Sequence, residues 1–168
     1  MEPWQRLDLA SREEARRLLS TCCGSSAWVE RMVRRRPFAS AGTLLTAAHE
    51  AWADLTQTDW LEAFSHHPKI GDRASLAHRF PDTARLSSRE QSGVDAAAAD
   101  VLDALAAGNR AYEDRFGYIF IVCATGRSAT EMLGMLRVRL GNDPAEEIMI
   151  AAGEQAKITE LRLLGLGA

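Results

Sequence analysis

The chain has 168 residues, of which 46% are apolar and 26% are charged, and its formal net charge at pH 7 is -3. This length suits one domain that buries its own core, and both fractions are typical of globular proteins. The slightly acidic balance gives no basis for attraction to nucleic acid or to an anionic membrane surface. No apolar stretch approaches the length of a membrane span. We therefore expect one domain over residues 1–168, with no nucleic acid and no membrane among its partners.

The cysteines and the N-terminal residues bear on the cellular location. The chain has three cysteines, Cys22, Cys23 and Cys123. Their number is odd, two of them are adjacent, and no C-x-x-C spacing occurs. A disulfide framework or a zinc knuckle is therefore not expected, and a reducing compartment fits best. The first residues also lack the apolar core of a secretion signal. The sequence predicts a cytoplasmic protein.

Apolar periodicity and capping signals predict helices along most of the chain. In chain order they cover residues 12–22, 26–35, 41–55, 59–66, a long stretch opened by the capping box at Ser87 and reaching about 116, then 129–140 and a last helix from 144. That last helix has Pro144 at its first position, where proline is welcome. Its predicted apolar stripe consists of Ile148, Ala151, Ile158, Leu161 and Leu164.

One segment interrupts this helical pattern. Residues 117–124 form an apolar, β-branched run with strong strand propensity, but no second run of this kind exists to pair with it. Its amides and carbonyls must find other partners, either neighbouring helix ends and water or a polar ligand. The predicted fold class is a compact all-α domain of about seven or eight helices with one short extended apolar segment.

A proline-stiffened corner follows the fourth predicted helix. Pro68 moves His67 out of the helical region, so that helix is expected to end near His66. The imidazole then sits on a stiff corner, a favourable place for an acid–base group because the pKa of histidine lies near neutrality. The alternative is a histidine that only offsets the last carbonyls of the helix.

A second group of candidate residues opens the long helix. Glu90 and Gln91 fall in its first turn, where unpaired N–H groups and the helix dipole favour an anionic substrate. Glu90 would accept a proton or orient His67, and Gln91 would read an amide-like edge. The alternative is that Glu90 only bonds back to the Ser87 amide and completes a capping box.

Other kinds of site find less support. The histidines lack the H-x-x-x-H or H-E-x-x-H spacing of a metal site, and the chain has no G-x-S-x-G elbow, P-loop or dinucleotide fingerprint. Cys123 stands in the middle of an apolar run, where a thiol packs rather than reacts.

Four motifs in the correct order resemble the OHCU decarboxylase family, whose substrate is 2-oxo-4-hydroxy-4-carboxy-5-ureidoimidazoline. They are His-His-Pro-Lys-Ile-Gly-Asp at 66–72, Ser-Ser-Arg-Glu-Gln-Ser-Gly at 87–93, residues 116–128, and Arg139-Leu140-Gly141-Asn142-Asp143 followed by Glu154, Lys157-Ile158 and Leu161-Arg162-Leu163. The resemblance implies loss of CO2 from OHCU to leave (S)-allantoin, the last step from uric acid. It also implies an all-helical homodimer with no metal and no organic cofactor.

The resemblance also implies roles for individual residues. His67 matches the essential histidine of the family, and Glu90 matches its acidic partner. The positions implied to contact the substrate are Pro68, Ser87, Gln91, Ile119, Phe120, Ile121, Val122, Cys123, Ala124 and Arg127. Three alternatives stay open: a helical module that binds ureides or purines without turnover, a decarboxylase of a related heterocycle, and an interaction domain that uses its amphipathic helices.

Overall fold

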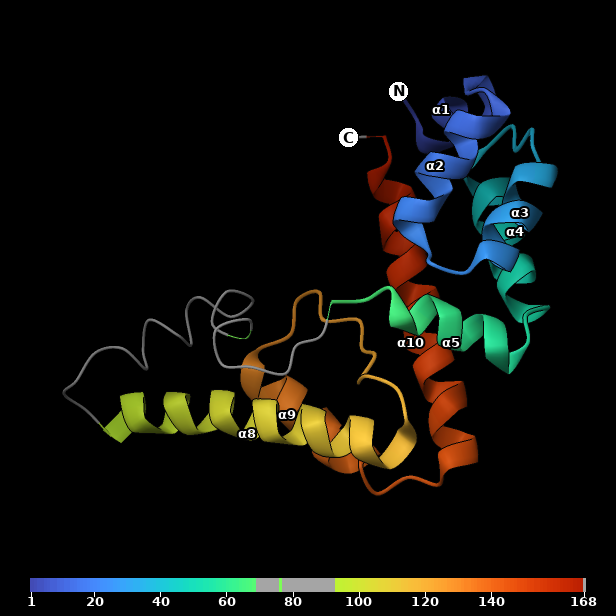
Figure 1. Cartoon of the computed structure of the whole chain (residues 1–168). Coiled ribbons are helices and arrows are strands. Elements are labelled where there is room, and N and C mark those ends of the chain that lie inside the picture. The colour runs from blue at the N-terminus through green and yellow to red at the C-terminus, as the bar shows by residue number, and fades with distance from the viewer. Residues whose placement is uncertain (69–75, 77–92, 168) are drawn as a thin grey trace. The chain divides into compact units, whose positions relative to one another are not determined.

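The computed structural model describes residues 1–68, 76 and 93–167, and within these residues the chain forms eight α-helices and no β-strand (Figure 1). This confirms the predicted all-α class. The helices are α1 (Pro3–Leu9), α2 (Arg12–Cys22), α3 (Ser26–Arg34), α4 (Ala41–Ala53), α5 (Gln57–Ser65), α8 (Gly93–Phe116), α9 (Ala129–Arg139) and α10 (Pro144–Gly165). None of these described helices is long and apolar enough to cross a lipid bilayer.

Most helix starts are set by local side-chain caps. Each capping oxygen accepts a hydrogen bond from the backbone amide three residues further on. The pairs are Ser11 with Glu14, Ser25 with Trp28, Ser40 with Thr43, Thr56 with Asp59, and Ser128 with Glu131. The predicted starts of α2, α3, α4 and α9 are therefore confirmed. The prediction for α5 began two residues late, because its capping pair is Thr56 with Asp59. The predicted capping box at Ser87 lies outside the described residues.

The described chain divides into two compact units. Unit 1 comprises 1–67, 121–123 and 151–168, and unit 2 comprises 68–120 and 124–150. The single domain over residues 1–168 stays a prediction.

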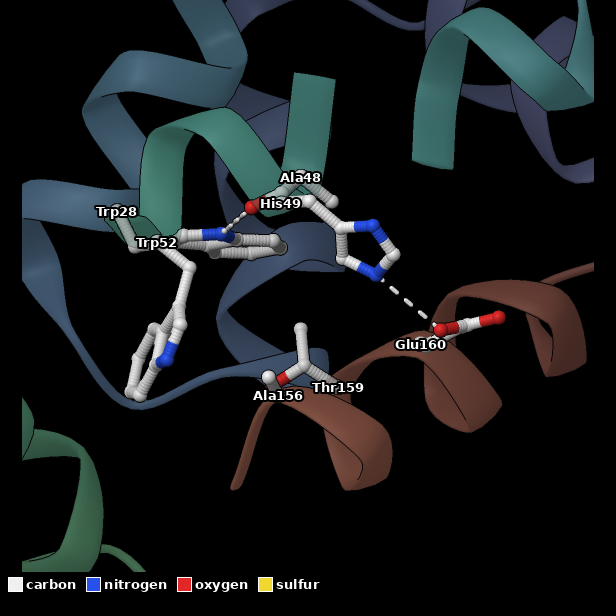
Figure 2. A pocket seen from close by; sticks show the side chains of 7 residues that line it. All are labelled: Trp28, Ala48, His49, Trp52, Ala156, Thr159 and Glu160. Carbon is white, nitrogen blue, oxygen red and sulfur yellow. Dashed lines mark hydrogen bonds and ion pairs between the residues drawn. The ribbon is translucent and has the colours of Figure 1, made fainter. Parts of the chain in front are cut away.

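In unit 1 the C-terminal part of α10 packs against α2, α3 and α4. The Trp52 indole N–H donates to the Ala152 carbonyl at 3.1 Å, and the Arg162 guanidinium donates to the Cys22 carbonyl at 3.2 Å. A small cleft between α4 and α10 is flanked by His49 and Glu160, whose Nε2 and Oε2 atoms lie 3.2 Å apart (Figure 2). These contacts fix the part of α10 that carries the candidate site.

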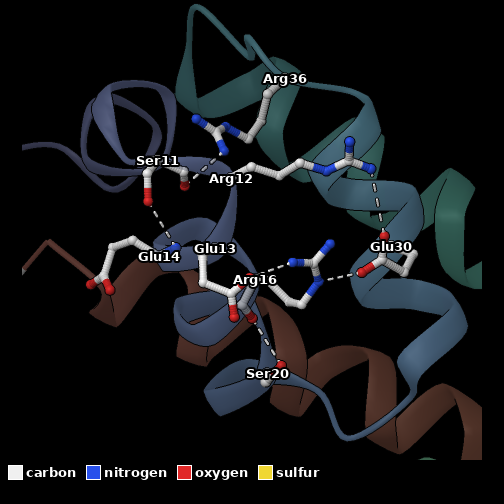
Figure 3. Close-up of polar contacts among 8 residues, drawn as sticks. All are labelled: Ser11, Arg12, Glu13, Glu14, Arg16, Ser20, Glu30 and Arg36. Atoms are coloured by element: carbon white, nitrogen blue, oxygen red, sulfur yellow. Dashed lines mark hydrogen bonds and ion pairs between the residues drawn. The ribbon is translucent and has the colours of Figure 1, made fainter.

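Exposed ion pairs join α2 to α3 on the surface of unit 1 (Figure 3). Arg16 donates from Nε to Glu30 at 2.5 Å and from Nη1 to Glu13 at 2.8 Å. Arg12 reaches the other Glu30 oxygen at 4.0 Å. Because solvent screens these partly exposed side chains, each pair is expected to contribute little to stability.

In unit 2, α8 and α9 pack closely at a glycine. A Cβ atom at Gly108 would fall 2.6 Å from Leu136 Cδ2, so the missing side chain permits this approach. Beyond Gly108 the end of α8 carries Tyr112, whose ring meets the rings of Tyr118 and Phe120 edge-on with centroids 5.8 and 5.2 Å apart. This aromatic cluster anchors the beginning of the extended segment.

Candidate functional site

The corner after α5 has the conformation that Pro68 predicts. The helix ends at Ser65, and the His66 and His67 amides donate to the Ala63 and Phe64 carbonyls at 3.3 and 3.2 Å. Phe64 is 1% exposed and anchors this turn in the core of unit 1. The predicted end of the helix near His66 is confirmed.

The half-buried His67 ring makes a hydrogen bond to a residue far along the chain. Its Nε2 atom lies 2.5 Å from Oε1 of Gln155, which stands on α10 and is fully buried. The amide nitrogen of Gln155 lies 3.2 Å from the Thr159 hydroxyl, one turn further along the same helix. The imidazole orientation is therefore tied to α10, and not only to the end of α5.

A neighbouring residue of α10 binds the extended segment. The Cys123 amide donates to Oε2 of Glu154 at 2.7 Å, and Lys157 donates to Oε1 of the same carboxylate at 2.5 Å. Ile121 and Val122 are buried, at 2% and 6% exposure. A side-chain carboxylate thus supplies one of the partners that this isolated segment needs. Residues 121–123, His67 and Glu154 all belong to unit 1.

Glycines mark both ends of the extended segment. Gly117 has a φ of 79° and Gly126 a φ of 76°, a backbone region that other residues rarely adopt. At the second of these turns the Arg127 amide donates to the Ala124 carbonyl at 3.1 Å. The glycines at the two ends of the segment thus have a conformational cause.

A buried polar cluster of unit 2 contacts the extended segment at Phe120. Glu147 is fully buried, and its carboxylate receives hydrogen bonds from Arg139 Nε at 2.7 Å, from Asn142 at 2.7 Å and from the Tyr112 hydroxyl. The Arg139 guanidinium also lies 4.6 Å from the centre of the Phe120 ring. Burial, and then the bond to Glu147, raise the pKa of Tyr112 far above its usual range, so this hydroxyl stays protonated.

The predicted site residues fall into three groups. His67 and residues 121–123 belong to unit 1, whereas Pro68, Ile119, Phe120, Ala124 and Arg127 belong to unit 2. Pro68 and Arg127 are exposed, and Ile119, Phe120 and Ala124 are half-buried. Ser87, Glu90 and Gln91 lie outside the described residues. Among the described residues, no three His, Cys, Asp or Glu side chains gather as metal ligands.

The predicted apolar stripe of α10 was partly wrong, and the error concealed Gln155. Leu161 and Leu164 are each 46% exposed, whereas the buried positions include Gln155 and Thr159, four residues apart. Counting forward from Ala151 in steps of four reaches both polar residues, because residues four apart share one helix face. The polar residues that share a helix face with Ala151 were therefore the signal in the sequence for Gln155 and Thr159.

A glycine beside the corner leads to a prediction about stability. A Cβ atom at Gly24 would fall 2.5 Å from Cβ and Cγ of His66, so Gly24→Ala must displace the corner. We expect the free energy of unfolding to fall by about 1–3 kcal/mol, as in other overpacked sites, measured by urea denaturation. Gly42→Ala is the control, because its new Cβ would meet only Ser40 Oγ at 3.9 Å. Equal stability of the two variants would contradict the observed contact.

The fold and the polar contacts define an all-helical protein with buried polar side chains on one long helix that hold a histidine and an extended segment. Within that class, the chain belongs to the OHCU decarboxylase family, which it matches over residues 8–164.

Relatives and solved structures agree with this membership. The chain is 45% identical over 146 residues to the uric acid degradation bifunctional protein TTL of Arabidopsis thaliana, covering 86% of this chain and 45% of that protein. It is 46% identical over 55 residues to the 2-oxo-4-hydroxy-4-carboxy-5-ureidoimidazoline decarboxylase of Amia calva, covering 33% of this chain and 31% of that protein. The matched regions thus cover less than half the length of each of these two relatives.

Two solved structures have a similar fold. A crystal structure of OHCU decarboxylase in the presence of (S)-allantoin matches with a TM-score of 0.70 and 37% identity, covering 94% of this chain and 98% of that one. A crystal structure of (S)-allantoin synthase matches with a TM-score of 0.71 and 20% identity, covering 97% and 53% of the two chains. The second likeness concerns the fold alone.

Proposed function

We propose that the protein is a cofactor-independent carboxy-lyase that converts OHCU to (S)-allantoin in uric acid degradation. The observation that carries this proposal is the match to OHCU decarboxylase at 37% identity over 94% of this chain and 98% of that one. The bifunctional relative from Arabidopsis thaliana, which is named for uric acid degradation, supports the same route. We further propose a cytoplasmic homodimer, as the family resemblance and the cysteine usage suggested.

The chemistry of the substrate is compatible with catalysis by protein side chains. When the bond to CO2 breaks, its electron pair moves into the C=N bond of the substrate ring and leaves an enol-like intermediate. The substrate therefore supplies its own electron sink. The protein is left to orient the ring, to move protons and to stabilise the developing charge.

The proposed roles follow the family resemblance, residue by residue. His67 takes the proton of the 4-hydroxyl group as CO2 leaves, and Glu90 is its acidic partner. A proton delivered to one face of the ureido-bearing carbon then sets the S configuration. The proposed substrate contacts are Pro68, Ser87, Gln91, residues 119–124 and Arg127. Support for a fixed segment comes from the Cys123 amide, which Glu154 holds at 2.7 Å.

A coupled assay tests the proposed activity. Urate, urate oxidase and HIU hydrolase generate OHCU in the cuvette, and absorbance and circular dichroism follow its decay and the handedness of the product. We expect faster decay and an excess of (S)-allantoin, whereas spontaneous decay gives the racemate. Decay that is not accelerated and gives a racemic product would refute the proposal. If the protein slows the decay, it is a binding module; if it leaves the decay unchanged, it is an interaction domain.

A further inference from the structure

Three buried side chains lead away from His67 in unit 1. Gln155 and Thr159 of α10 are 0% and 4% exposed, and Cys23, the residue after α2, is 0% exposed. Gln155 joins His67 to Thr159, with distances of 2.5 Å to the imidazole Nε2 and 3.2 Å to the hydroxyl oxygen. None of these three side chains is among the site residues that the family resemblance implies. Their contacts determine which atoms carry hydrogen.

The direction of each hydrogen bond follows from the chemistry of the partners. Burial raises the pKa of the Cys23 thiol to about 11, and this thiol is also a hydrogen-bonding partner of Thr159. The amide nitrogen of Gln155 can only donate hydrogen bonds, and it donates to the Thr159 hydroxyl oxygen at 3.2 Å. The amide oxygen of Gln155 is then the atom that faces His67.

An amide oxygen only accepts hydrogen bonds, so the imidazole nitrogen beside it must carry a hydrogen. The partner of one ring nitrogen thereby decides the protonation of the other. We propose that Gln155 is a positioning residue that keeps the proton on Nε2 of His67, so that Nδ1 is the nitrogen that exchanges a proton with the substrate. This inference rests on the proposed function.

The proposal assigns one defined proton transfer. The O–H bond of the substrate 4-hydroxyl breaks, an N–H bond forms at Nδ1, and the ring becomes an imidazolium that keeps its Nε2–H bond to Gln155. The amide oxygen accepts that bond in both protonation states, so the ring need not turn during the reaction.

The tautomer of His67 can be read without turnover. Long-range 1H–15N spectra of the full chain with 15N-labelled histidine distinguish protonated from unprotonated ring nitrogens, and His67→Asn identifies the His67 signals. We expect the neutral ring to carry its proton on Nε2. A wild-type ring that carries its proton on Nδ1 would overturn the proposal, whatever the result of the coupled assay.

Variants separate positioning from packing. Gln155→Leu and Thr159→Val should give mixed tautomers at His67, whereas Gln155→Glu should keep the proton on Nε2, because a carboxylate also accepts this bond. Gln57→Leu makes the same chemical change at an exposed position of α5 and should change nothing. In turnover, Gln155→Leu should lower kcat about tenfold with KM changed by less than about twofold. An unchanged tautomer in folded Gln155→Leu would exclude the role; if that variant does not fold, Thr159→Val decides.

Discussion

Replacing His67 by alanine is expected to lower kcat/KM about 100- to 10,000-fold, the range by which a positioned acid–base group accelerates a reaction. The product should become racemic, because the remaining decay is spontaneous. His67 is half-buried at the end of a helix, so the fold should survive its truncation. The coupled assay with circular dichroism measures both effects.

The neighbouring histidine provides a matched control. His66 is exposed, and His66→Ala keeps the Cβ atom that lies close to Gly24. This variant should retain rate and stereochemistry. An undiminished yield of (S)-allantoin from His67→Ala would remove His67 from the mechanism.

Glu90→Gln, in the same assay, separates a catalytic carboxylate from a helix cap. Loss of a cap would cost about 1 kcal/mol of stability and little activity, whereas loss of a catalytic carboxylate would lower the rate severely.

Replacing Arg139 by methionine is expected to lower the free energy of unfolding by about 3–5 kcal/mol, because it leaves the buried Glu147 carboxylate without its charge partner. Arg139 Nη2 lies 2.6 Å from Glu147 Oε1, and the two side chains are 6% and 0% exposed. Urea denaturation followed by circular dichroism measures the change.

Two further variants show whether burial is the cause. Arg139→Met combined with Glu147→Met should recover part of the lost stability, because an apolar pair of similar volume needs no charge compensation, although Tyr112 and Asn142 then lose their acceptor. Arg16→Met removes a pair of the same type, Arg16 with Glu30 at 2.5 Å, whose side chains are 34% and 37% exposed. Because solvent screens that pair, Arg16→Met should cost much less stability than Arg139→Met. Equal costs for Arg139→Met and Arg16→Met would contradict this account.

Local signals predicted most of the described fold. Serine caps placed the starts of α2 and α9, and Pro68 placed the end of α5, because these effects act within a few residues. Helix α1 was missed, although Pro3 at its first turn and the pairing of Glu2 with Gln5 were visible in the sequence. Its short length left too few apolar residues for periodicity to reveal it.

Contacts between distant residues escaped sequence reasoning. His67 and Gln155 are 88 positions apart, and no local pattern indicates that α10 turns Gln155 towards the end of α5. The carboxylate that binds the Cys123 amide is 31 positions away. Local sequence signals suggested His67 and Glu90 as candidates and the family resemblance implied their roles, but the residue that holds His67 required the fold.

The two adjacent thiols have a consequence for the chemical durability of the protein. Burial raises the pKa values of Cys22 and Cys23 to about 11, so that at pH 7 only about one molecule in ten thousand has either as the reactive thiolate. Alkylating agents and peroxide attack the thiolate, and the surrounding core also hinders their approach. Storage in air should therefore leave this pair reduced for as long as unit 1 stays folded.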